Sequence, residues 1–241
     1  MAIERIEHQA SYILNRRNYQ ESSLIVDVFS LQFGRISLVA KGALRSKKNW
    51  SALLQAFQPL LLSWSGRSTL KTLTMVEAPS KPLSLKSERL YCAYYLNELV
   101  LKLLPEQETN SGIFASYVQA LQSLEDNNKL EVILRLFEYD LLKQLGLAPD
   151  FFRDIDGIDI IEENLYSLIP SHGFDKLSLD SSEGEDGSHI LVLDGLTLLK
   201  LYSGAFQNET DFLSMASRAR FFRQAKALMR VLVDQALLGF L

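Results

Sequence analysis

Cationic side chains gather beside a tryptophan in the segment GRISLVAKGALRSKKNW, residues 34–50. Arg45, Lys47 and Lys48 occupy the loop that follows a short alternating stretch, and Trp50 closes the segment. Cations neutralise the phosphates of single-stranded nucleic acid, and aromatic rings stack on its bases. The pattern therefore predicts a loop that contacts such a strand, although a tryptophan beside a loop more often covers a hydrophobic core.

Cations extend beyond this loop through the first third of the chain. Residues 1–82 contain 11 Lys and Arg against 5 Asp and Glu, whereas the remainder contains 14 against 24. The net charge of −4 thus combines a basic region with an acidic one, and a basic region favours a polyanionic partner. A solvated, charged β surface is the alternative interpretation, and Tyr19 is a second aromatic that could stack on bases. The candidate nucleic-acid-binding residues are Arg16, Arg17, Arg35, Lys41, Arg45, Lys47, Lys48, Trp50, Arg67 and Lys71.

A second cationic set lies near the end of the chain. Arg220, Arg223, Lys226 and Arg230 fall within an arc of about 120° when residues are spaced at 100° on a helix. Such a face could hold phosphate or an acidic peptide, and a solvated helix face is the commoner explanation. Elsewhere, Glu131 precedes Arg135 by one helical turn, which predicts a surface ion pair.

Five short segments rich in β-branched, leucine and aromatic residues must position the N-terminal cations. They are residues 10–17, 22–31, 35–42, 55–63 and 69–77. In the third of them, Ile36, Leu38 and Ala40 alternate with other residues at period two, as on a half-buried strand. Five short strands within about 70 residues match a small antiparallel barrel such as the OB-fold, whose concave face and loops bind oligonucleotides.

Prolines at positions 79 and 82 end the strand pattern and predict a boundary between domains at 1–79 and 83–241. Helices are expected at 84–104, 111–124, 130–145, 197–206 and 211–238. The first of these is apolar almost all round, which predicts a central buried helix. Residues 150–190 are strongly acidic and predict an irregular excursion, with a hairpin near 166–179. The fold class is therefore α+β, with an N-terminal OB-fold β-barrel and a helical C-terminal region.

Sites for metals and catalysis are not evident in the sequence. His8, His172 and His189 are scattered, and Cys92 is the only cysteine, so no disulfide within the chain, zinc site or other metal site is expected. Motifs of the Walker A, GxGxxG and GxSxG types are absent from the sequence. We therefore expect a protein that is not an enzyme and needs no cofactor. An N-terminus without an apolar signal segment and the lack of a membrane span predict a cytoplasmic protein with no membrane partner.

The residues also resemble the RecO family of bacterial recombination and repair proteins. In the strand-rich part, the matching segments are ESSLIVDVFS at 21–30, GR at 34–35, VAKGA at 39–43, RSKK at 45–48, QAFQPL at 55–60 and KTL at 71–73. In the helical part they are YCAYYLNEL at 91–99, RLFE at 135–138 and LG at 145–146. The resemblance covers most of the chain and weakens after residue 147.

The resemblance implies a non-enzymatic mediator of recombination, associated with the nucleoid. Family members bind single- and double-stranded DNA, anneal complementary strands, and act with RecR to load RecA onto DNA coated by single-strand-binding protein (SSB). They also bind the acidic, Phe-terminated SSB tail through the helical domain. Candidate contacts for that tail are Arg135, Arg220, Arg223, Lys226 and Arg230.

Two departures from the family pattern qualify this expectation. Some relatives carry a four-cysteine zinc module where residues 150–189 have no cysteine, and many have a basic segment after the final helix, whereas this sequence stops at Leu241. The mediator hypothesis also has a rival, in which the basic face docks an acidic protein partner and the chain is a non-catalytic adaptor. A nuclease-like enzyme is a third and weaker alternative.

Overall fold

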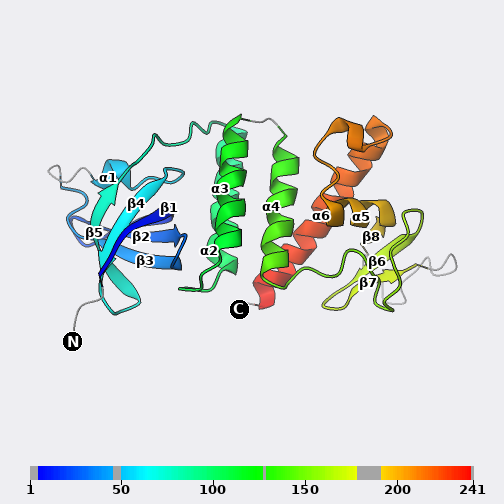
Figure 1. Ribbon diagram of the computed structural model, residues 1–241, viewed down its shortest axis with the longest axis horizontal. Coiled ribbons are helices and arrows are strands. Elements are labelled where there is room, and N and C mark those ends of the chain that lie inside the picture. The colour runs from blue at the N-terminus through cyan, green and yellow to red at the C-terminus, as the bar shows by residue number, and fades with distance from the viewer. Residues whose placement is uncertain (1–4, 46–49, 127–128, 178–190, 240–241) are drawn as a thin grey trace. The chain divides into compact units, whose positions relative to one another are not determined.

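A closed five-stranded barrel forms the N-terminal part of the protein. The computed structural model describes residues 5–45, 50–126, 129–177 and 191–239 (Figure 1). The strands are β1 (Arg5–Tyr19), β2 (Ser23–Ser30), β3 (Gly34–Ala40), β4 (Leu60–Ser65) and β5 (Leu70–Glu77), with the short helix α1 (Trp50–Leu53) between β3 and β4. They close in the order β1-β2-β3-β5-β4, and β3 and β5 are parallel. The predicted OB-like barrel followed by a helical region is confirmed.

Apolar side chains at every second position of the strands fill the interior of the barrel. Val26 and Val28 of β2 point into the core with Ile36 and Leu38 of β3, and all four are buried. Successive residues of a strand face opposite sides, so the residues between them line the outer surface. The period-two pattern of the sequence therefore separates core positions from candidate binding positions.

A β-bulge in β1 changes this phase and ties the barrel to a helix. The β1–β2 register shifts between Ile13 and Asn15, which leaves the Leu14 carbonyl outside the ladder. The buried Asn97 of α2 (Glu88–Leu103) donates its Nδ2 to that carbonyl at 2.8 Å. The Tyr117 hydroxyl of α3 (Ser111–Asp126) donates to Asn97 Oδ1 at 2.6 Å, so the polar groups at this junction are satisfied internally.

Helices α2 and α3 complete the barrel rather than standing apart from it. Tyr12 of β1 and Phe29 of β2 lie on the outer surface, where both pack against Phe114 and Tyr117 of α3 with ring centroids 5.1 to 6.1 Å apart. The chain accordingly divides into two compact units, Met1–Leu130 and Glu131–Leu241. The domain boundary at residues 79–83 stays a prediction about the sequence.

One face of α2 is exposed, contrary to the expectation of a helix buried all round. The Tyr91 residue is 74% exposed and Tyr94 is 52% exposed, although the ring of Tyr94 contacts Phe57 edge-on. Leu96, Leu99 and the rest of the buried face suffice to dock α2. A tyrosine keeps an apolar ring and a polar tip, so it tolerates this half-wet position better than leucine would.

The connection between α2 and α3 rests on the β2–β3 turn. The Arg35 Nε donates to the Leu104 carbonyl at 2.9 Å, and the Gln107 N–H donates to the Arg35 carbonyl at 2.8 Å. Gly34 has a φ of +61°, and a Cβ added there would lie 2.0 Å from the Glu108 carbonyl oxygen. The turn therefore requires glycine for its backbone angle and for the close approach of the two segments.

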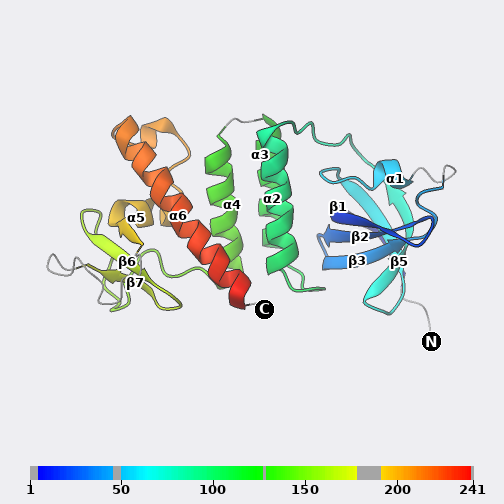
Figure 2. The ribbon, with the colours of Figure 1, turned by 180° about the vertical axis from the view of Figure 1, so that it is seen from behind.

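The second unit combines helices with a small sheet. Its elements are α4 (Leu130–Gln144), β6 (Leu165–Ile169), β7 (Gly173–Lys176), β8 (Val192–Asp194), α5 (Gly195–Ser203), the 3-10 helix η1 (Glu209–Asp211) and α6 (Met215–Gly239). Figure 2 shows α5 and the sheet together at one side of α6. The predicted hairpin is confirmed as β6–β7, and β8 adds a strand that the sequence did not predict, in the order β7-β6-β8.

Asp194 joins the sheet, α5 and α6. Its Oδ1 accepts the Thr197 N–H at 2.8 Å, which caps the N-terminus of α5, and its Oδ2 lies 2.8 Å from Arg220 Nε of α6. Within the described residues, no helix is both long and apolar enough to cross a membrane.

Candidate nucleic-acid interface

The outer surface of β1, β2 and β3 carries three rows of paired side chains beyond the part that α3 covers. Tyr19 lies opposite Ser23 in the first row. The second row pairs Arg17 with Ile25 and Ile25 with Val39, and the third pairs Asn15 with Asp27 and Asp27 with Ser37. The surface thus combines an aromatic ring, a cation and a buried carboxylate around an apolar centre.

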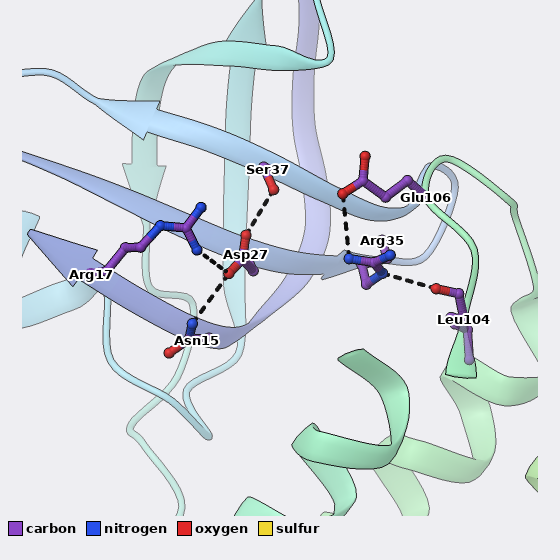
Figure 3. Close-up of polar contacts among 7 residues, drawn as sticks. All are labelled: Asn15, Arg17, Asp27, Arg35, Ser37, Leu104 and Glu106. Atoms are coloured by element: carbon purple, nitrogen blue, oxygen red, sulfur yellow. Dashed lines mark hydrogen bonds and ion pairs between the residues drawn. The ribbon is translucent and has the colours of Figure 1, made fainter. Parts of the chain in front are cut away.

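Asp27 accepts hydrogen bonds from three side chains of this surface (Figure 3). Its Oδ1 accepts the Ser37 hydroxyl at 2.7 Å, and its Oδ2 accepts Arg17 Nη1 at 3.1 Å and Asn15 Nδ2 at 3.3 Å. Asp27 is only 7% exposed, whereas the Arg17 side chain is 56% exposed. A buried carboxylate needs such donors, and the exposed guanidinium keeps further N–H donors available to a ligand.

Cations and aromatics from the predicted set continue from this surface at the end of β3. Lys41 follows Ala40 in the outward phase and is exposed, as is Arg45, and Tyr19 at the end of β1 is 37% exposed. Trp50 is half-buried and packs against the barrel core, which agrees with the alternative interpretation that this tryptophan covers a hydrophobic core. Lys47 and Lys48 lie outside the described residues.

Two of the predicted arginines are engaged in holding the fold. Arg16 Nη1 donates to the carbonyls of Ser51 at 3.0 Å and Leu54 at 3.3 Å, where α1 ends. Arg35 holds the α2–α3 connection, and its Nη1 lies 3.4 Å from Glu106 Oε1 (Figure 3). Phosphate contact by either residue stays a prediction.

Arg67 and Lys71 lie toward β5. Arg67 is exposed in the β4–β5 turn, while Lys71 is half-buried and lines a cavity of about 150 Å³ with Phe33 and Trp64. The parallel β3–β5 pairing puts Lys71 opposite Leu38, one residue from Ser37 along β3. These cations therefore flank the β3 side of the barrel rather than the row that holds Arg17.

The second cationic set borders a groove in the second unit. Arg223 and Lys226 of α6 are exposed and line a groove of about 460 Å³. Its other lining residues are Glu131, Met215, Arg218, Ala219 and Phe222. Arg220 instead pairs with Asp194, and Arg230 lies 4.0 Å from Asp234, so only two of the four predicted cations line the groove.

Arg135 differs from the surface pair that its spacing predicted. It is 8% exposed, and its Nη2 lies 2.9 Å from Oε1 of the buried Glu138 rather than bonding Glu131. Both residues lie on the packed face of α4, where a one-turn offset of three residues brings them together. A role for Arg135 in binding an acidic tail stays a prediction.

Comparisons with known proteins decide the family. The sequence matches the family models described as Recombination protein O N terminal, over residues 3–80, and Recombination protein O C terminal, over residues 85–238. The chain belongs to the RecO family. A DNA repair protein RecO from Marinobacter nauticus is 37% identical over 238 residues, covering 97% of this chain and 90% of the relative. Another from Alteromonas mediterranea is 42% identical over 197 residues, covering 81% and 82%.

Membership of the RecO family gives this chain a role in DNA repair and recombination. Reasoning from the sequence missed Asp27 and Asn15 as members of the site, because only cations and aromatics were sought. The alternation of β2 places Asp27 on the outer surface and could have revealed it. Asn15 gave no such signal, because its direction depends on the bulge at Leu14.

Proposed function

We propose that this protein binds single-stranded DNA on the outer surface of β1–β3 and anneals complementary strands. The observation that carries the proposal is the grouping of Arg17, Lys41 and Tyr19 on one surface of an OB-like barrel. Cations there neutralise phosphates while the tyrosine stacks on a base, and neither contact reads the sequence. Lysine and arginine side chains that bind the phosphates displace the counterions of the DNA. The affinity for DNA therefore falls steeply as the salt concentration rises.

Annealing follows from charge neutralisation. Two bare strands repel each other through their phosphates, and a cationic surface that holds one strand lowers this repulsion for the second. Base pairing then supplies the sequence specificity. On this mechanism the protein catalyses no covalent step and needs no cofactor, and double-stranded DNA binds through the same phosphate contacts.

We place the SSB tail in the groove beside α6. An acidic tail with a terminal phenylalanine needs cations around an apolar floor, and the groove offers Arg223 and Lys226 around Phe222. Family membership supports cooperation with RecR and the loading of RecA onto SSB-coated DNA in the cytoplasm.

The decisive experiment measures annealing of two complementary oligonucleotides, bare and SSB-coated, across a salt series. Lys41→Ala and Arg45→Ala should slow annealing severalfold at low salt, whereas Lys102→Ala removes an exposed cation of α2 and should leave the rate unchanged. Arg223→Ala with Lys226→Ala should slow only the SSB-coated reaction.

Each result separates the parts of the proposal. Annealing confined to bare strands would remove the tail assignment and keep the DNA surface. If the wild-type protein shows no binding of DNA at low salt, the basic surface serves an acidic protein partner instead. The hypothesis of a non-catalytic adaptor then replaces that of a recombination mediator.

A further inference from the structure

A carboxylate within a cationic surface opposes the binding of a polyanion. Asp27 lies in this position between β1 and β3, and its charge is held by Arg17, Asn15 and Ser37 (Figure 3). Aspartate carries a negative charge at neutral pH, and three donors bind its two oxygens, so a negative charge is built into this surface. A neutral residue could have filled the same position.

The bulge in β1 is what brings the cation to the carboxylate. Ile13 belongs to the barrel core, so strict alternation would turn Asn15 and Arg17 inward as well. The extra residue at Leu14 reverses the phase, and both side chains then reach Asp27 on the outer surface. The same bulge is held by Asn97 of α2, so the orientation of Arg17 is fixed by the packing of the unit.

The pair presents directed donors with little net charge. Arg17 uses Nη1 for Asp27, and the remaining N–H groups of a guanidinium fork can bind a phosphate oxygen. Beyond the contact distance, the charges of Arg17 and Asp27 cancel. A phosphate there gains a positioned hydrogen bond without the full counterion release of an unpaired arginine.

We propose that Asp27 is a positioning residue that orients Arg17 toward the DNA strand and limits the electrostatic contribution of the surface to DNA affinity. This inference rests on the proposed DNA binding. A strand that is held too tightly cannot pair and leave, so a compensated arginine suits a protein that brings strands together and releases the duplex.

The test compares the salt dependence of single-stranded DNA binding in four proteins: wild type, Asp27→Asn, Arg17→Gln and the double variant. Asp27→Asn should steepen the slope of log K against log salt by about 0.7, because one uncompensated cation is gained. Its affinity advantage over wild type should shrink about fivefold for each tenfold rise in salt. The double variant, which removes both charges, should return to the wild-type slope.

A control removes an acid from an ion pair of the same unit in which both side chains are exposed. Glu98→Gln frees Lys102 of α2 with the same change of net charge and should leave the slope unchanged. Should Asp27→Asn fail to fold by circular dichroism, Asp27→Thr removes the charge with a residue suited to a strand.

The outcomes divide cleanly. An unchanged slope for Asp27→Asn, or a double variant shallower than wild type by about 0.7, overturns the role of Asp27 while DNA binding stands. Wild-type protein without salt-dependent DNA binding overturns the proposed function and this inference together.

Discussion

At the residue scale, Gly34 is under two constraints at once. It adopts a left-handed φ of +61°, and the backbone of Glu108 occupies the space that a Cβ would need. Gly42 provides a contrast in the same unit, since its φ is +67° but a Cβ there would meet only the flexible Arg45 side chain, at 3.6 Å. The two glycines therefore separate conformational strain from steric overlap.

We expect Gly34→Ala to lower the free energy of unfolding by about 2–4 kcal/mol, because strain and displacement of the α2–α3 connection add together. Gly42→Ala should cost about 1 kcal/mol, the price of the left-handed conformation alone. Urea unfolding followed by circular dichroism measures both. Equal losses in the two variants would show that the Glu108 segment moves away freely.

At the scale of elements, the junction of β1, α2 and α3 is held by a buried hydroxyl. Burial raises the pKa of Tyr117 well above its ordinary value near 10, and burial raises the pKa of Tyr12 as well. In the unfolded chain Tyr117 ionises near pH 10. The stabilising contribution of Tyr117 to the free energy of unfolding is therefore complete below that pH, and it declines as the pH rises toward the pKa of Tyr117 in the folded protein.

Stability of the first unit should accordingly fall between pH 10 and 11, and Tyr117→Phe should reduce that fall. At pH 7 the same substitution should cost about 1–3 kcal/mol, because Asn97 loses the donor to its Oδ1. Urea unfolding midpoints measured at pH 7, 10 and 11 test both expectations, and Tyr91→Phe on the exposed face of α2 is the control. A fall of the same size in both variants would contradict the assignment to Tyr117.

At the scale of the whole molecule, charge and packing divide the chain at different places. Basic residues predominate up to position 82, whereas the first compact unit continues through α2 and α3 to Leu130. Tyr12, Phe29 and the Leu14 carbonyl need those helices as partners. The basic region is thus shorter than the structure that supports it.

A fragment of residues 1–130 should fold and retain salt-dependent binding of single-stranded DNA, because it contains the barrel surface and the helices behind it. A fragment of residues 1–82 should melt at a much lower temperature or aggregate, since it exposes two aromatic rings and an unpaired carbonyl. Thermal melts and fluorescence anisotropy measure these properties. An equally stable 1–82 fragment would show that α2 and α3 are dispensable to the barrel.

The sequence by itself determined the barrel, most helices and the family. Period-two alternation and turn residues define strands locally, and the structure shows a comparable local contact in α3, where the Asn110 side chain accepts the Ile113 N–H. These signals depend on neighbours in the chain. The resemblance to RecO likewise used short segments such as 21–30 and 39–43 and was confirmed by the family comparison.

Only the tertiary structure decided what each cation does. Arg16, Arg17 and Arg35 look alike in the sequence, yet one bonds the end of α1, one holds Asp27, and one anchors the α2–α3 connection. Arg135 likewise has a role that its spacing did not predict, because it is buried and forms an ion pair with Glu138. A long charged side chain takes the partner that distant packing brings within reach, and a bulge at one residue reverses the direction of those that follow, so residue type and spacing alone leave these roles open.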